Sequence, residues 1–454
     1  MFPDDHPGSR ALFERALKVM PGGNSRHTVY FPPYPVYAAK GEGARVTDVD
    51  GVSRLDFINN YSSLIHGHCH PEVTAAITRQ AATLQAVSLP TEAEIELAEL
   101  LCARLPSVEQ IRFANSGTEG VMMAIKAARG FTGRRLIAKV EGAYHGSDDT
   151  AAVSTYPHPS KWSDPDEGRG VSEPGSGPGA AADVIILQMN DVEGGRRLIK
   201  RHGAELAAVL VDPLVKNLGY RPASPAFLEM LREETRAAGA LLIFDEVYSL
   251  RLGYGGAQEV LGVRADLTAL GKIIGGGLPV GAVGGSAEIM TAVFDPRGGK
   301  AKVSHGGTYN ANPLTMAAGA VSMRLFDRAA FDRLSGLGDR LRKGLAEAAS
   351  AAGATARVTG AASIVGLFHM SGSGETFRDM AKARMENPEA GRKAEHFFRH
   401  MLDNGVLMGA PGFFVLSTAL TEADIDHVIN EAHVAFSTPP RGHVWNVFVR
   451  PASS

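Results

Sequence analysis

The sequence of 454 residues has almost no cysteine, no basic excess and no long apolar run. Its two cysteines, Cys69 and Cys102, cannot build a disulfide framework, which indicates a reducing compartment and predicts a cytoplasmic protein. The formal net charge of −3 gives no basic field, so we expect no nucleic-acid partner. No stretch of about eighteen uninterrupted apolar residues occurs, so we expect no membrane span, and the first ten residues lack the pattern of a signal peptide.

Apolar runs of strand length recur through the middle of the chain, most of them separated by helical stretches. They cover residues 110–114, 135–140, 183–188, 207–212, 240–245 and 279–285. This alternation predicts an α/β fold with a parallel sheet covered by helices. We predict a large domain over residues 61–320, with an N-terminal segment 1–60 that joins a smaller C-terminal α+β domain over 321–454.

Three segments outside these strands have distinct patterns. Residues 156–180 are rich in proline, glycine and serine and have no periodicity, so they form either a lid or a disordered excursion. Thr91 to Glu94 has the spacing of a helix capping box, and Thr421 begins another capped, amphipathic helix.

Several candidate ligand positions follow the predicted strands. Asp212 and Asp245 end two of them, where ligands bind in open parallel sheets, although acids also end strands because loops are polar. The predicted helix over 115–130 begins "NSGTE". Its first N–H groups could bind a phosphate, or the small polar residues could serve only as an N-cap. The turn 306–313, "GGTYNANP", is a second candidate anion site or a plain turn. Lys272 stands between an apolar run and three glycines, which is unusual for a surface lysine.

Two other motifs resemble a metal site and a nucleotide-binding site but lack essential residues. His66, His68 and His70 alternate as zinc ligands on a strand would, but Pro71 follows at once and no acid or cysteine cluster has ligand spacing. We therefore expect no metal site. No GxGxxG joins a strand to a helix and "GKI" lacks the hydroxyl of a P-loop, which disfavours a nicotinamide-dependent dehydrogenase.

The motifs "SGTE", "AYHG", "FDEV", "DLTALGKIIGGGLPVGAVGG" and "GGTYNANPLTMAAG" occur in this order. Together they resemble the class III aminotransferases of the fold-type I pyridoxal-phosphate enzymes, above all glutamate-1-semialdehyde aminomutases and β-amino-acid (β-phenylalanine-type) aminotransferases. The resemblance runs from Met20 to the C-terminal helix. It implies a large domain with a mainly parallel seven-stranded sheet between helices, and a smaller α+β domain formed by both chain ends.

The resemblance also implies the site residues and the cofactor, pyridoxal 5′-phosphate. Lys272 would form the internal aldimine with the cofactor aldehyde and carry the substrate proton, while Asp245 would keep the pyridine nitrogen protonated. The other implied cofactor contacts are Ser116, Gly117 and Thr118 around the phosphate, Tyr144 and Val247 on the two ring faces, His145 beside Tyr144, Asp212, and Thr308 from the neighbouring subunit. Asp212 stands where many relatives have glutamate, and the contact of Thr308 implies a homodimer.

Arg26 resembles the arginine that binds a substrate carboxylate in these families. Pro411 stands where the β-amino-acid branch has a second arginine, which leaves the acceptor open. The leading hypothesis is an aminotransferase that passes an amino group between an ω- or β-amino acid and a carbonyl acceptor by ping-pong chemistry. The alternative is an aminomutase of the glutamate-1-semialdehyde type. In a non-catalytic cofactor-binding protein we would expect the lysine or the aspartate to be replaced, but this sequence retains both Lys272 and Asp245.

Overall fold

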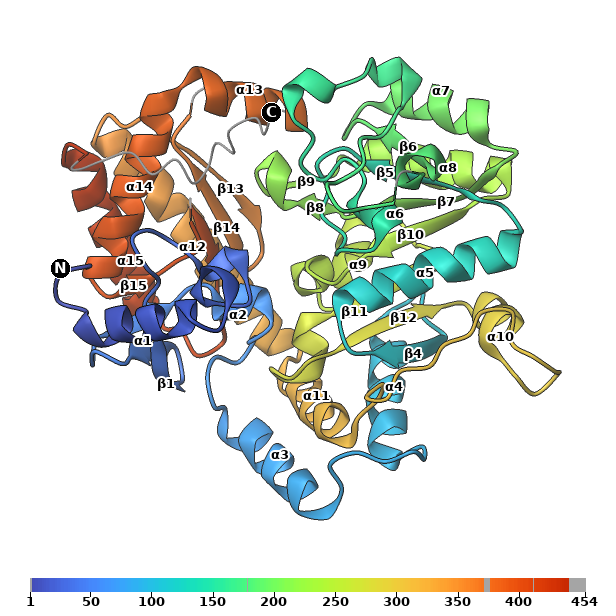
Figure 1. Cartoon of the computed structure of the whole chain (residues 1–454), viewed down its shortest axis with the longest axis horizontal. Helices are drawn as coiled ribbons and strands as arrows, with labels where there is room; N and C mark the ends of the chain where they lie inside the picture. Colours follow the sequence, from blue (N-terminus) through green and yellow to red (C-terminus); the bar gives the residue numbers. More distant parts are fainter. Residues whose placement is uncertain (1, 178, 371–375, 411, 441–454) are drawn as a thin grey trace.

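Seven strands form the central sheet of the large half of the protein (Figure 1). The computed structural model describes residues 2–177, 179–370, 376–410 and 412–440. The strand order is β4 (Gln110–Ala114), β12 (Gly281–Gly285), β11 (Leu267–Gly271), β10 (Leu241–Asp245), β7 (Leu206–Val211), β5 (Leu136–Val140) and β6 (Val184–Leu187). β12 is antiparallel to both of its neighbours, and the other adjacent pairs are parallel. The predicted mainly parallel sheet is therefore confirmed.

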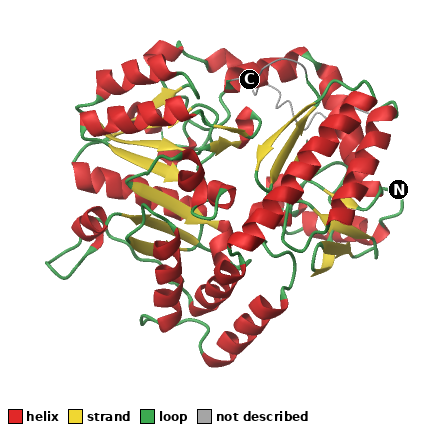
Figure 2. Ribbon diagram, turned by 180° about the vertical axis from the view of Figure 1, so that it is seen from behind, coloured by secondary structure: helices red, strands yellow, loops and turns green. Residues whose placement is uncertain are grey.

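Helices cover both faces of this sheet (Figure 2). α5 (Gly117–Thr132) and α10 (Ala287–Phe294) pack on one face, and α7 (Val192–His202) and α8 (Pro225–Ala238) pack on the other. Because both faces are covered, strands such as β7 and β10 are buried along their whole length. Each fully buried leucine, valine or phenylalanine stabilises the fold by roughly 1.5–3 kcal/mol.

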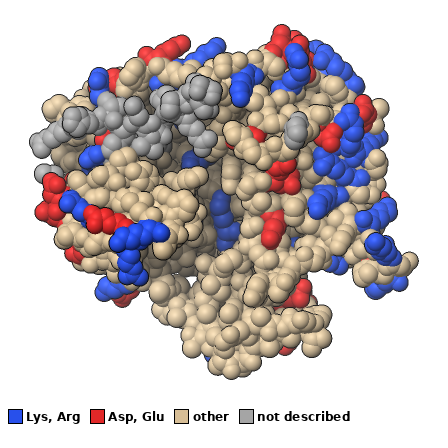
Figure 3. Space-filling model, in the orientation of Figure 1, with Lys and Arg blue, Asp and Glu red and all other residues tan. Residues whose placement is uncertain are grey.

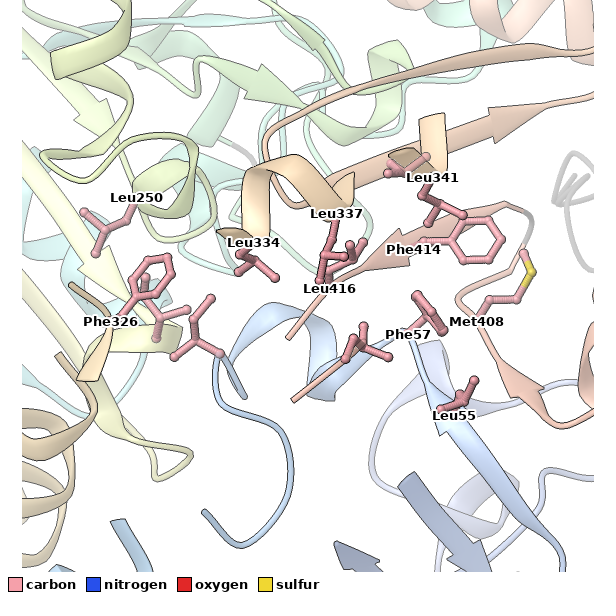
Figure 4. Close-up of a cluster of buried hydrophobic side chains, with 14 of the residues drawn as sticks. Leu55, Phe57, Leu250, Phe326, Leu334, Leu337, Leu341, Met408, Phe414 and Leu416 are labelled. Atoms are coloured by element: carbon pink, nitrogen blue, oxygen red, sulfur yellow. The ribbon is translucent and has the colours of Figure 1, made fainter. Parts of the chain in front are cut away.

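The second half joins the two ends of the chain. β1 (Ala38–Glu42), β2 (Arg45–Asp48) and β3 (Ser53–Asp56) form a sheet with β15 (Val406–Leu407), and β13 (Arg357–Ala361), β14 (Ile364–Phe368) and β16 (Phe413–Val415) form another. α12 (Arg328–Ala351), α14 (Pro388–Asp403) and α15 (Glu422–Ser437) surround these sheets. Figure 4 shows their common core, in which the Phe57 and Phe414 ring centroids are 5.9 Å apart. The domain boundaries at 60 and 320 stay a prediction.

The remaining helices are shorter or lie at the periphery. They are α1 (Pro7–Leu17), α2 (Asn59–Ser62), α3 (Pro71–Thr83), α4 (Glu92–Arg104), α6 (Asp149–Ala152), α9 (Gly256–Leu261), α11 (Pro313–Leu325) and α13 (Phe377–Glu386), and a short ribbon pairs β8 (Leu214–Val215) with β9 (Arg221–Pro222). The capping box at Thr421 is confirmed, whereas the one at Thr91 is wrong, because the Thr91 hydroxyl has no hydrogen-bond partner among the described residues. Within the described ranges, no helix combines the length and apolarity that a membrane crossing requires.

The proline- and glycine-rich segment lies along the edge of the large sheet. Arg169 bridges to Ile185 of β6, and Asp166 pairs with Arg197 of α7 at 2.6 Å. Trp162 packs against the core cluster of that side. Residues 162–169 therefore pack beside the sheet, and whether the whole segment acts as a lid stays a prediction.

Candidate active site

Four strands of the large sheet end at one cavity of about 370 Å³. Asp245 is the last residue of β10, Lys272 directly follows β11, Asp212 directly follows β7, and the Tyr144–His145 pair follows β5. The carboxyl ends of parallel strands meet at one edge of a sheet, which explains why residues so far apart in sequence come together. Figure 3 shows a groove between the two halves of the molecule, with basic side chains at its floor.

Most of the residues predicted from the sequence line this cavity. They are Arg26, Gly117, Thr118, Tyr144, His145, Asp212, Asp245, Val247 and Lys272. Two predicted residues do not line it. Ser116 lies just behind its wall and caps α5, where its hydroxyl accepts the Glu119 N–H at 3.2 Å. Thr308 is exposed and lies away from this cavity within a single chain.

The amine of Lys272 lies inside the cavity wall. Its nitrogen is 4.5 Å from the centroid of the Tyr248 ring. Burial lowers the pKa of Lys272 to about 8, although the carboxylates of Asp245 and Asp212 act in the opposite direction. The residue has a left-handed backbone with φ of 51°, an unfavourable conformation for a side chain with a Cβ, and such conformations cluster at functional sites. The arrangement therefore raises the fraction of neutral, nucleophilic amine near neutral pH far above that of an ordinary lysine.

Asp245 is held in place by two hydrogen bonds. The Nδ1–H of His145 donates to one carboxylate oxygen at 2.7 Å, and the N–H of Val247 donates to the other at 3.0 Å. Burial lowers the pKa of His145, and Asp245 only partly offsets this effect, so the imidazole stays neutral. Burial, together with the nearby charge of Asp245, raises the pKa of Asp212 to about 7. The cavity thus holds one fixed carboxylate, Asp245, beside an acid, Asp212, that readily takes up a proton.

The N-terminus of α5 forms another wall, where glycines allow close packing. A Cβ on Gly117 would lie 2.6 Å from Val247, and a Cβ on Gly281 would lie 1.8 Å from the carbonyl oxygen of Ser116. The first N–H groups of a helix have no intrahelical acceptors and carry the positive end of the helix dipole. Gly117 and Thr118 at the cavity wall therefore suit a phosphate group.

Arg26 reaches the cavity from the N-terminal segment. One of its guanidinium nitrogens donates to the side-chain oxygen of Asn60 at 2.8 Å. Asn60 lies in α2, where four consecutive residues, Asn59 to Ser62, have positive φ. The sequence reasoning missed Asn60 and Tyr248. Tyr248 directly follows the quoted "FDEV" motif, which could have indicated it, whereas nothing local in the sequence indicated Asn60.

The histidine motif is used in hydrogen bonding. His66 lies 2.9 Å from both the Thr418 hydroxyl and the Ser322 carbonyl oxygen, and His68 lies 2.8 Å from a carboxylate oxygen of Asp56. Pro411, the position that separates the chain from the β-amino-acid branch, lies outside the described residues.

Comparison with known proteins agrees with this geometry. A family model described as "Aminotransferase class-III" matches residues 29–435. The chain is 38% identical to a β-phenylalanine transaminase of Variovorax paradoxus, over 94% of this chain and 92% of the relative. It is 39% identical to a glutamate-1-semialdehyde 2,1-aminomutase of Brevibacillus brevis, over 94% and 97% of the two chains. An ω-transaminase structure from Sphaerobacter thermophilus superimposes with a TM-score of 0.89 at 49% identity, over 94% and 97% of the two chains. The chain belongs to the class III aminotransferase family of fold-type I enzymes, and its cofactor is pyridoxal phosphate.

Proposed function

We propose that the protein is an aminotransferase that passes an amino group between a β- or ω-amino acid and a carbonyl acceptor in a ping-pong reaction. The observation that carries this proposal is the Lys272 amine, which is held partly out of water beside Asp245 in a cavity that Arg26 also lines. The amine supplies a nucleophile and a proton carrier, and the guanidinium supplies a partner for a carboxylate.

The residues at the cavity fit the cofactor of the family. The N-terminus of α5 suits the phosphate, with Gly117 and Thr118 at the cavity wall. Asp245 is oriented by His145 and would hold the proton of the pyridine nitrogen through a charge-assisted hydrogen bond. Tyr144 and Val247 would flank the ring. When bound, the cofactor supplies an aldehyde that accepts the amino group and a ring that withdraws electrons from the substrate Cα.

Lys272 would then perform the proton transfer. The neutral amine would remove the proton from the substrate Cα as a general base, and the ammonium so formed would donate it to the cofactor's aldehyde carbon as a general acid. A pKa of about 8 suits both directions, because each protonation state is accessible near neutral pH. Asp212, whose pKa is raised to about 7, interacts electrostatically with this amine.

Arg26 would orient the substrate. Its hydrogen bond to Asn60 fixes the guanidinium, which can bind a carboxylate with two parallel hydrogen bonds. We assign the acceptor only as a carbonyl compound.

We also propose a homodimer. Large apolar side chains are exposed on and beside α3 and α4, among them Leu84, Leu89 and Ile95, and Tyr309 is exposed beside Thr308. Figure 3 shows few charged side chains on the lower lobe, where Figure 1 places α3. Such a surface is typical of a subunit interface. A molar mass of one chain in sedimentation equilibrium would contradict the dimer.

The test of the function follows nitrogen between molecules. The holoenzyme is incubated with ¹⁵N-labelled β-phenylalanine or a ¹⁵N-labelled ω-amino acid and a separate keto acid, and the labelled product is identified by mass spectrometry. We expect label in the amine formed from the keto acid, and we expect Lys272→Ala to reduce its formation by at least about a thousandfold. No transfer to any acceptor by the wild-type holoenzyme would refute the proposal.

The same experiment tests the alternative, an aminomutase, which the similarity to the Brevibacillus relative favours. An aminomutase moves the amino group within one molecule. With glutamate-1-semialdehyde as substrate it would form 5-aminolevulinate without passing label to an added keto acid.

A further inference from the structure

Lys216 lies close enough to the active site for its charge to act on Lys272, and it has no role in the chemistry described above. It begins a short 3-10 turn, Lys216–Leu218, that directly follows β8. Its side chain is exposed, and its nitrogen is 5.8 Å from the centroids of both the Tyr61 and Phe413 rings. These two rings are stacked with a centroid distance of 6.4 Å. The ammonium is therefore held over a defined aromatic surface.

The same aromatic surface continues to the reactive amine. The Phe413 ring lies 6.1 Å from the Tyr248 ring, and Tyr248 lies under the nitrogen of Lys272 at 4.5 Å. The charge of Lys216 also contributes, after burial, to the lowered pKa of Lys272. The two lysines thus lie at different points of one aromatic wall, within electrostatic range of each other.

A second cation, Arg384, lies near enough to Lys216 for the two charges to interact. Arg384 lies on α13, which packs against the turn that carries Lys216. The surrounding protein lowers the pKa of Lys216, and the positive charge of Arg384 lowers it further. No acidic side chain within the described ranges forms an ion pair with either residue. Two unpaired cations close to each other are unfavourable, and an anion bound between them would offset that cost.

We propose that Lys216 and Arg384 form a second anion-binding subsite, which takes a distal carboxylate of the substrate while Arg26 takes the first. The aromatic wall between the subsites, formed by Tyr61, Phe413 and Tyr248, suits the methylene chain that joins two carboxylates. At least one substrate of the enzyme is then a dicarboxylic amino acid or keto acid. The inference rests on the proposed function for the position of the reacting carbon.

Binding of unreactive acids to the holoenzyme tests the subsite without turnover. Glutarate and pentanoate have equal chain lengths and differ in the second carboxylate, and their dissociation constants are measured by isothermal titration calorimetry. We expect glutarate to bind at least about tenfold more tightly than pentanoate. Lys216→Met and Arg384→Met should each weaken glutarate binding by about five- to tenfold and pentanoate binding by less than about twofold.

Matched controls separate the subsite from a general charge effect. Lys382→Met removes a positive charge from the same helix as Arg384 and should change neither constant. Lys216→Arg keeps the charge and should retain most of the preference for glutarate. Equal affinities of the wild-type enzyme for the two acids would overturn the proposal, whether or not the variants fold. Equal losses for both acids in Lys216→Met, or no loss, would also overturn it.

The outcome is distinguishable from a failure of the proposed function. If the subsite is absent but the function is right, nitrogen transfer from a monocarboxylic β-amino acid persists while glutarate shows no preference. If the function is wrong, nitrogen transfer is absent, and the calorimetric comparison still reports on Lys216 and Arg384.

Discussion

The amine of Lys272 should titrate far below the range of an ordinary lysine in the cofactor-free protein. Its pKa is lowered from 10.5 to about 8, mainly because the surrounding protein disfavours the charged form. At about pH 7.5 a pKa of 8 leaves roughly a quarter of these amines neutral, against about one in a thousand for a free lysine side chain. The neutral fraction of Lys272 is therefore roughly 200-fold larger than its ordinary pKa would allow, and its reaction with an electrophile is faster by this factor at equal access and equal reactivity of the neutral amine.

Competitive labelling measures this effect at a single residue. The apoprotein is treated with a trace of acetic anhydride between about pH 6 and 11, and peptide mass spectrometry gives the labelling rate of each lysine. Lys343 is exposed on α12 and serves as the internal reference. The rate for Lys272 should reach half of its maximum near pH 8.

The effect of the neighbouring carboxylates on the pKa of Lys272 can be tested separately. The carboxylate of Asp245 raises the pKa of Lys272, so Asp245→Asn should move the midpoint to a lower pH. A midpoint above about pH 9.5 in the wild-type protein, or an upward shift in the variant, would refute the reasoning about burial and charge at this site.

Two further predictions concern stability, measured by urea denaturation of the apoprotein. Gly281→Ala should destabilise it by about 3 kcal/mol or more and weaken cofactor binding, because the new Cβ would lie 1.8 Å from the Ser116 carbonyl oxygen. Gly336→Ala in α12 meets no atom within 4 Å and should stabilise it by about 0.5–1 kcal/mol; equal effects of the two variants would contradict the packing argument. Burial lowers the pKa of His66 from 6.5 to about 4, so unfolding takes up a proton in this window and stability should fall as pH drops from 6.5 towards 4. The loss attributable to His66 is roughly 2 kcal/mol between about pH 7 and 5, and an unchanged pH dependence in His66→Gln would disprove it.

Most strands of the large sheet could be predicted from the sequence because they are buried on both faces. Continuous apolar runs predict such strands without knowledge of their neighbours, as at β5, β7 and β10. The predicted strands did not include β11, where Thr268 and Gly271 interrupt the apolar pattern. A local motif can also predict a feature that does not form. Thr91 and Thr421 both have the sequence of a capping box, but only Thr421 forms one.

The cavity wall that contains Arg26 and Asn60, which we propose faces the substrate, depends on contacts that no local pattern encodes. Asn59 to Ser62 form a left-handed turn, which costs about 1–2 kcal/mol per residue for side chains with a Cβ. The buried amide of Asn59 holds the turn by donating to the carbonyl oxygens of Asp56 at 2.9 Å and Val415 at 2.8 Å.

The contact with Val415 joins positions 356 residues apart, so this support of the turn depends on the packing of the two chain ends against each other. Once formed, it brings Asn60 to Arg26 and Tyr61 to the ring of Phe413. The residues that fit the cofactor, by contrast, follow directly from the ends of large-domain strands and the start of α5. Substitutions can therefore alter the substrate-facing wall without disturbing the cofactor-facing one. This separation gives a physical reason why relatives of nearly equal identity are named as a transaminase and as an aminomutase.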